Sequence, residues 1–208
     1  YDFMCVLLSG NIFLGKLASK NQVLLPYVSN LLCNINPAFK DCISFQKEIK
    51  DVDVLIATGN DSTASHFHYL YSKTNKIIRK NRTSIAVVNG LEESEDYEKL
   101  SHDVYMYFGL GCRSVSKVFL PKNFDIDKLK HAFKNYKANS FSKDYAQSYH
   151  YQKTLYQIND LSFIDFDNLL LLESNHIHSP IGVLYYEYYD NLNSLKEYLV
   201  KCKNEIQC

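Results

Sequence analysis

The chain has 208 residues, and its 23 Lys and Arg are balanced by 23 Asp and Glu, so the formal net charge is zero. This balance argues against nucleic acid as the main partner, because phosphate binding needs a basic excess or stripe. Hydrophobic residues make up 46% and Gly and Pro are few, which excludes disordered, collagen-like and low-complexity structure. No apolar run reaches the ~20 residues of a membrane-spanning helix.

The opening segment and the cysteines indicate a reducing compartment. The apolar run 3–8 has no basic segment before it and no cleavage signature, so it is not a signal peptide. The six cysteines form no Cys-x-x-Cys pair, and a chain of this length does not need disulfides to fold. We therefore expect free thiols and a cytoplasmic location. Because the first residue is Tyr1, we interpret the chain as a piece of a longer protein.

Short strands and helices alternate along the first half of the chain. The expected elements are, in order, a strand within 10–17, a helix over 21–34, a strand over 51–57, a helix to about Lys73, and strands over 76–79 and 84–88. The run Val54-Leu55-Ile56-Ala57 has no polar alternation, which is typical of a parallel strand buried on both faces. Strand, helix and strand at these lengths predict a parallel α/β sheet.

A longer helix opens the second half, over 92–108, with Tyr97, Leu100, Val104 and Phe108 on one apolar stripe. Gly109 then stands where a helix C-terminal glycine belongs. The remaining elements expected are a strand over 118–120, helices over 127–136 and 143–159, strands over 169–172 and 183–188, and a helix over 192–203. The boundary between two domains is expected near residue 85.

Cys112 is the strongest candidate for chemistry. It lies between a glycine turn and a strand, in Gly109-Leu-Gly-Cys-Arg113. Glycines let the backbone approach a substrate closely, and Arg113 would favour the thiolate, which is the nucleophilic form. The alternative is a buried structural cysteine, the commoner role of a lone Cys.

Two other patterns carry weaker signals. Thr58-Gly59-Asn60 ends an expected parallel strand and opens a helix, where ligands and phosphates bind in α/β sheets; an ordinary strand-to-helix turn is the alternative. The chain holds no Gly-x-Gly-x-x-Gly and no Walker loop. The pairs His66/His68 and His176/His178 lack the further neighbours that a metal site needs, so we expect no metal.

Several segments match one superfamily in order: Ser9–Lys16, Val54–Asn60, Ile78–Ser84, Phe108–Phe119 and Ser179–Leu184. On these segments the chain resembles the aldehyde dehydrogenase superfamily. It is most similar to the fatty acyl-CoA reductases that supply long-chain aldehyde to bacterial luciferase. The resemblance implies an aldehyde-dehydrogenase-like α/β fold, with part of a Rossmann-type NADPH-binding domain over 1–85 and an α/β catalytic domain over 86–208.

The activity implied by this resemblance is the NADPH-dependent reduction of a long-chain acyl-CoA to a fatty aldehyde. Cys112 would carry the acyl group as a thioester intermediate, with Arg113 beside it. The resemblance also allows homo-oligomers and a partner enzyme that transfers acyl groups. The positions that match the cofactor contacts of the family are Lys16, Thr58, Gly59 and Asn60.

The chain departs from the superfamily at three positions. The glutamate base of hydrolytic members is replaced within 79–82 by Arg-Lys-Asn-Arg, which favours acyl-CoA reduction because water must not attack the acyl-enzyme. The glutamate that holds the nicotinamide ribose aligns near His176. The oxyanion asparagine would precede Tyr1, and losing such a donor costs ~10²–10³ in rate. We therefore interpret the chain as a truncated copy that lacks both ends.

Two alternatives stay open. The first is an acyl-phosphate reductase of the same superfamily. The second is a non-catalytic or decayed fragment that binds an acyl chain, a nucleotide or a protein partner.

Overall fold

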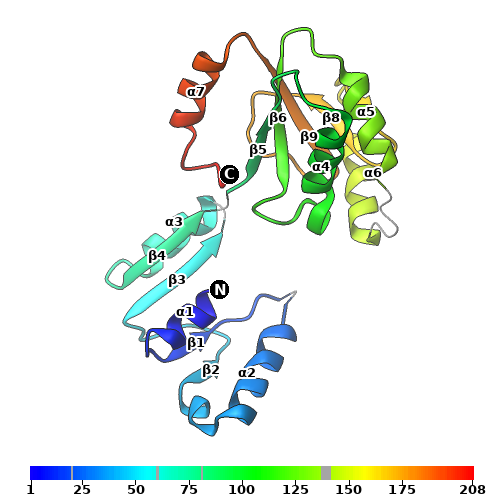
Figure 1. Ribbon diagram of the computed structural model, residues 1–208. Helices are drawn as coiled ribbons and strands as arrows, with labels where there is room; N and C mark the ends of the chain where they lie inside the picture. The colour runs from blue at the N-terminus through cyan, green and yellow to red at the C-terminus, as the bar shows by residue number, and fades with distance from the viewer. Residues whose placement is uncertain (20, 60, 81, 137–141) are drawn as a thin grey trace. The chain divides into compact units, whose positions relative to one another are not determined.

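The computed structural model describes residues 1–208 except 20, 60, 81 and 137–141 (Figure 1). The chain divides into two compact units, Tyr1–Lys80 and Asn81–Cys208. Among the helices of the described residues, none combines the length and the apolar character needed to cross a membrane.

The first unit contains two separate parallel pairs of strands, β1 with β2 and β3 with β4. The predicted strand–helix–strand segment is confirmed, because β3 and β4 are parallel and α3 connects them. The elements of this unit are α1 (Asp2–Leu8), β1 (Phe13–Gly15), α2 (Leu24–Ile35), the 3-10 helix η1 (Pro37–Asp41), β2 (Ile43–Phe45), β3 (Val54–Gly59), α3 (Asp61–Leu70) and β4 (Asn75–Lys80).

The prediction that the run 54–57 is buried on both faces is wrong. Val54 is 52% exposed, and Leu55 is the buried residue of the strand. The physical reason is that, among the described residues of this unit, β3 pairs with β4 alone, and two strands with one connecting helix cannot cover both faces. The strand also continues through Thr58 and Gly59, which the sequence assigned to a turn.

The second unit is built on one sheet of order β5-β6-β9-β8-β7. All neighbouring strands are parallel except β7, which is antiparallel to β8, so the predicted parallel α/β class is confirmed. Its elements are β5 (Ser84–Val87), α4 (Ser94–Tyr105), the 3-10 turn η2 (Met106–Gly109), β6 (Val115–Pro121), α5 (Ile126–Asn135), α6 (Lys143–Ile158), β7 (Ile164–Asp165), β8 (Leu170–Glu173), β9 (Val183–Tyr189) and α7 (Leu192–Lys201).

Helices cover both faces of this sheet (Figure 1). Alternating strand residues point to opposite faces, so Val118 packs with α4 and α5, whereas its neighbour Phe119 packs with Leu195 of α7. Helix α6 contributes Tyr145 to the first cluster and Tyr149 to a second one. The sheet is therefore the middle of three layers, with helices on each face, as the near-continuous apolar character of β6 requires.

The residues after α7 return to the outer edge of β5. The Thr83 N–H donates to the Glu205 carbonyl at 3.0 Å, and the Gln207 N–H donates to the Thr83 carbonyl at 2.8 Å. The Ile85 N–H donates to the Cys208 carbonyl at 3.0 Å. This segment therefore forms an isolated parallel bridge between Ile206 and Thr83, the residue directly before β5.

Candidate active site

The chain reaches Cys112 through a left-handed turn. Helix α4 was predicted to continue to Phe108, but it ends at Tyr105, and Met106 rather than Gly109 is its C-cap. Tyr107, Phe108 and Gly109 follow with φ of 54°, 58° and 71°. The left-handed conformation costs about 1–2 kcal/mol for each residue that carries a Cβ. The apolar spacing could not predict this break, because Phe108 continues the stripe of the helix in sequence but not in space.

Contacts on both sides hold this left-handed turn in place. The buried Ser114 hydroxyl donates to the Met106 carbonyl at 3.0 Å. The Phe108 ring lies 6.5 Å from the ring of Tyr145, centroid to centroid, and the Tyr145 hydroxyl donates to the Asn168 carbonyl at 3.0 Å. Burial raises the pKa of Tyr145, so this hydroxyl stays a protonated donor. Strained backbone persists where its surroundings fix it in this way.

Cys112 stands at the tip of the next turn. The Ser114 N–H donates to the Gly111 carbonyl at 2.9 Å, so Cys112 and Arg113 are the two central residues of a β-turn. Cys112 is exposed, and so is Arg113. The turn leads directly into β6, which carries the fully buried core residue Val118. A rigid strand thus presents the thiol on an exposed loop.

A buried serine ties Cys112 to the neighbouring strand. Ser84, which is 1% exposed, begins β5, and its hydroxyl donates to the Cys112 carbonyl at 3.0 Å. The same Oγ atom lies 2.9 Å from the Cys208 Sγ atom. The sequence indicated neither contact, because these residues are separated by 28 and 124 positions.

The four residues expected to contact a cofactor belong to the first unit. Lys16 is exposed and follows the end of β1, whereas Thr58 and Gly59 form the end of β3. Helix α3 starts so close to this strand that a Cβ atom at Gly59 would lie 2.7 Å from the Thr63 Cγ2 atom. Gly59 is therefore required by the tight connection from strand to helix. Asn60 lies outside the described residues.

His176 lies in the loop after β8, where its N–H donates to the Ser174 hydroxyl at 3.2 Å. It lines a groove of about 610 Å³ together with Tyr185 and Glu187. Among the residues that the structure describes, no three His, Cys, Asp or Glu side chains gather as metal ligands would.

Sequence reasoning missed an ion pair that includes Glu187 of this groove. Lys117 of β6 is fully buried, and its ammonium donates to the Glu187 carboxylate of β9. The Lys117 Nζ atom also lies 4.8 Å from the centroid of the Phe119 ring. The available signal was a single charged residue in each strand, Lys117 in β6 and Glu187 in β9.

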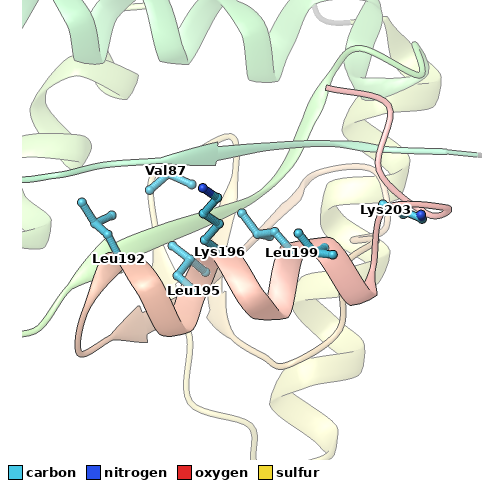
Figure 2. A pocket seen from close by; sticks show the side chains of 7 residues that line it. Val87, Leu192, Leu195, Lys196, Leu199 and Lys203 are labelled. Atoms are coloured by element: carbon cyan, nitrogen blue, oxygen red, sulfur yellow. The ribbon is translucent and has the colours of Figure 1, made fainter.

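An apolar groove of about 380 Å³ lies between helix α7 and strand β5. Figure 2 shows Leu192, Leu195 and Leu199 of the helix along one side of it and Val87 of the strand opposite. The strand that carries Ser84 therefore also carries an exposed apolar surface three residues farther on.

Comparison with known proteins identifies the fold. No family model matches the chain, and no curated protein matches it. Solved structures do match. Proline utilization A from Bradyrhizobium japonicum superposes with a TM-score of 0.75 at 11% identity, over 98% of this chain and 25% of that protein.

Two aldehyde dehydrogenases match over a larger share of their own length. The P. syringae indole-3-acetaldehyde dehydrogenase AldA, whose structure holds NAD+ and IAA, gives a TM-score of 0.69 at 10% identity, over 92% of this chain and 48% of that one. Aldehyde dehydrogenase 21 from Physcomitrella patens gives a TM-score of 0.72 at 12% identity, over 96% of this chain and 49% of that one. The chain thus spans from a quarter to about half of these proteins, and its mixed α/β architecture is an aldehyde-dehydrogenase-like fold.

Proposed function

We propose that the chain is the nucleophile-bearing part of an oxidoreductase that reduces an acyl-CoA to a fatty aldehyde with NADPH. The observation that carries this proposal is the exposed Cys112 thiol at the tip of a β-turn whose backbone is fixed from two sides. A cysteine held in this way in an aldehyde-dehydrogenase-like fold supports covalent catalysis.

Cys112 would attack the carbonyl carbon of the acyl thioester, form a new thioester with the enzyme and release the thiol of coenzyme A. The backbone N–H of Cys112 would donate to the oxyanion of the tetrahedral intermediate. Arg113, in the same turn, would stabilise the anionic sulfur before attack. The hydrogen bond from Ser84 to the Cys112 carbonyl would keep the peptide group between Cys112 and Arg113 fixed while these bonds change.

The residues of the first unit fit a nucleotide cofactor in chemistry. Gly59 ends β3 and leads into the amino end of α3, and the amino end of a helix favours a phosphate group. Thr58 offers an exposed hydroxyl and Lys16 an exposed ammonium. When bound, NADPH would supply the hydride that converts the thioester into aldehyde. We propose Asn60 as a fourth contact.

Segment 79–82 supports reduction rather than hydrolysis. The position of the glutamate base falls among Arg79, Lys80, Asn81 and Arg82. Arg79 lies in β4 and pairs with the Asp2 carboxylate, so it serves the first unit rather than activating water. Without a base, an acyl group on Cys112 would persist long enough to be reduced.

The decisive experiment is mass spectrometry of the protein at its full natural length after brief mixing with a long-chain acyl-CoA and no reductant. We expect one acyl adduct, on the Cys112 peptide, and its release as aldehyde when NADPH is added. Cys112→Ala should abolish the adduct. Cys5→Ala is the matched control, because Cys5 is also exposed, and it should leave the adduct unchanged.

An adduct that survives in Cys112→Ala, or that is spread over several thiols, would refute the mechanism. No adduct from acyl-CoA but one from an acyl phosphate would identify an acyl-phosphate reductase. No adduct from either would favour a binding or decayed domain. For the cofactor, Lys16→Ala should weaken NADPH binding in a titration of cofactor fluorescence, and an unchanged affinity would remove Lys16 from the site.

A further inference from the structure

Two cysteines converge on one buried hydroxyl group. The Ser84 Oγ atom donates to the Cys112 carbonyl at 3.0 Å and lies 2.9 Å from the Cys208 Sγ atom. A serine hydroxyl has a single proton to donate. Because that proton is engaged by the Cys112 carbonyl, the Cys208 thiol is the donor to Ser84. The network therefore runs in one direction, from Cys208 through Ser84 to Cys112.

Cys208 is held beside this network by the backbone. Its carbonyl accepts the N–H of Ile85, and its neighbour Gln207 donates to Thr83. Both Cys112 and Cys208 are exposed, so small oxidants can reach either sulfur.

The second unit holds one further cysteine, Cys202. Cys202 ends α7 and packs with Tyr198 and the Phe119 cluster, and the other three belong to the first unit. Cys208 is therefore the thiol that the second unit places next to the turn of Cys112.

We propose that Cys112 and Cys208 are a redox pair, in which Cys208 closes a disulfide on Cys112 when a peroxide oxidises it. The inference rests on the proposed function only in taking Cys112 as the more reactive thiol. The new bond has a length of about 2 Å, so the Cys208 sulfur would have to leave Ser84 and approach the Cys112 sulfur for it to form. The disulfide would block acylation of Cys112 and protect that sulfur from irreversible oxidation.

The chemistry balances with hydrogen peroxide as the oxidant. The Cys112 thiolate attacks one peroxide oxygen, the O–O bond breaks, and hydroxide leaves, so that Cys112 becomes a sulfenic acid. The Cys208 sulfur then attacks the Cys112 sulfur, the S–O bond breaks, and the hydroxyl group leaves as water with the Cys208 proton. The two thiols lose two electrons in total, and the peroxide gains them.

The test is peptide mapping without reductant after treatment with limited hydrogen peroxide and alkylation of the remaining thiols. We expect a linked Cys112–Cys208 peptide, a loss of two free thiols, and recovery of both with a thiol reductant. In Cys208→Ser the linked peptide should disappear and Cys112 should accumulate as sulfinic acid. Cys202→Ser, the matched control from the same unit, should form the linked peptide as the unaltered protein does.

Three results would overturn the proposal: Cys112 reaching sulfinic acid equally fast with and without Cys208, a disulfide from Cys112 to another cysteine, or no oxidation of Cys112. The acylation experiment is independent of this one. A disulfide without acylation would refute the proposed function and leave the redox pair standing, whereas acylation without the disulfide would refute the redox pair alone.

Discussion

The ion pair between Lys117 of β6 and Glu187 of β9 predicts that its two partners are unequal in their effect on stability. Lys117 has no exposed side-chain surface, whereas the side chain of Glu187 is 37% exposed and lines a groove. Removing Glu187 leaves a buried ammonium without its counter-charge. The loss of unfolding free energy from breaking such a pair is about 3–5 kcal/mol. Removing Lys117 leaves a carboxylate that water can reach, and methionine nearly fills the lost volume.

We therefore expect Glu187→Gln to lower the free energy of unfolding by about 3 kcal/mol, near the low end of that range because the amide oxygen still accepts a hydrogen bond. Lys117→Met should cost about 1 kcal/mol, as volume-conserving core substitutions do. The double variant leaves no buried charge without a partner. It should therefore also lose about 1 kcal/mol of unfolding free energy, rather than the sum of the two single losses.

Urea unfolding at neutral pH, followed by far-ultraviolet circular dichroism, measures all four free energies. Equal losses of unfolding free energy for Lys117→Met and Glu187→Gln would contradict a buried, uncompensated ammonium. Additive effects in the double variant would contradict it as well, because additivity would mean that the two charges do not interact.

Two further predictions concern glycine and tyrosine positions in the same unit. Gly182→Ala should lower the free energy of unfolding by about 3 kcal/mol, from a positive φ and from overpacking, since its Cβ would lie 2.8 Å from the Tyr149 Cα atom. Gly90→Ala also has a positive φ, but the nearest atom to its Cβ would lie at 3.6 Å, so it should cost about 1 kcal/mol. Equal losses for the two variants in urea unfolding would contradict a packing contribution at Gly182. Burial and the hydrogen bond to Asp165 raise the pKa of Tyr149 to about 12, so the folded state holds this proton after the unfolded state has lost it near pH ~10. Stability should therefore fall as the pH rises from about 10 to about 12, and Tyr149→Phe should make this fall shallower in alkaline unfolding.

Much of the fold was predictable because apolar spacing records which face of each element is buried. Helix α4 shows this well, since its stripe of Tyr97, Leu100 and Val104 is buried as expected. The parallel sheet followed from the alternation of strands and helices. The short strands β2 and β7 were missed, because two or three residues carry too little periodicity to be recognised.

The surroundings of Cys112 were less predictable than its place in the chain. Gly109 and Gly111, which both precede Cys112, marked the loop, but the left-handed turn at Tyr107 and Phe108 breaks local preference and is held by tertiary contacts. Ser84 and Cys208 meet across 124 positions, and no local pattern encodes a contact over that distance. Local physics therefore identified the candidate thiol, whereas its supporting contacts required the three-dimensional structure.

The pairing of residue 206 with β5 has a consequence for how the protein is made. On the ribosome, β5 is synthesised early in the second unit, yet the segment that pairs with its outer edge emerges more than a hundred residues later. During that interval the N–H groups of Thr83 and Ile85 have no backbone acceptor from this segment, and an open strand edge invites pairing with other chains. The nascent chain is thus most prone to self-association after β6 has formed and before Cys208 has been added.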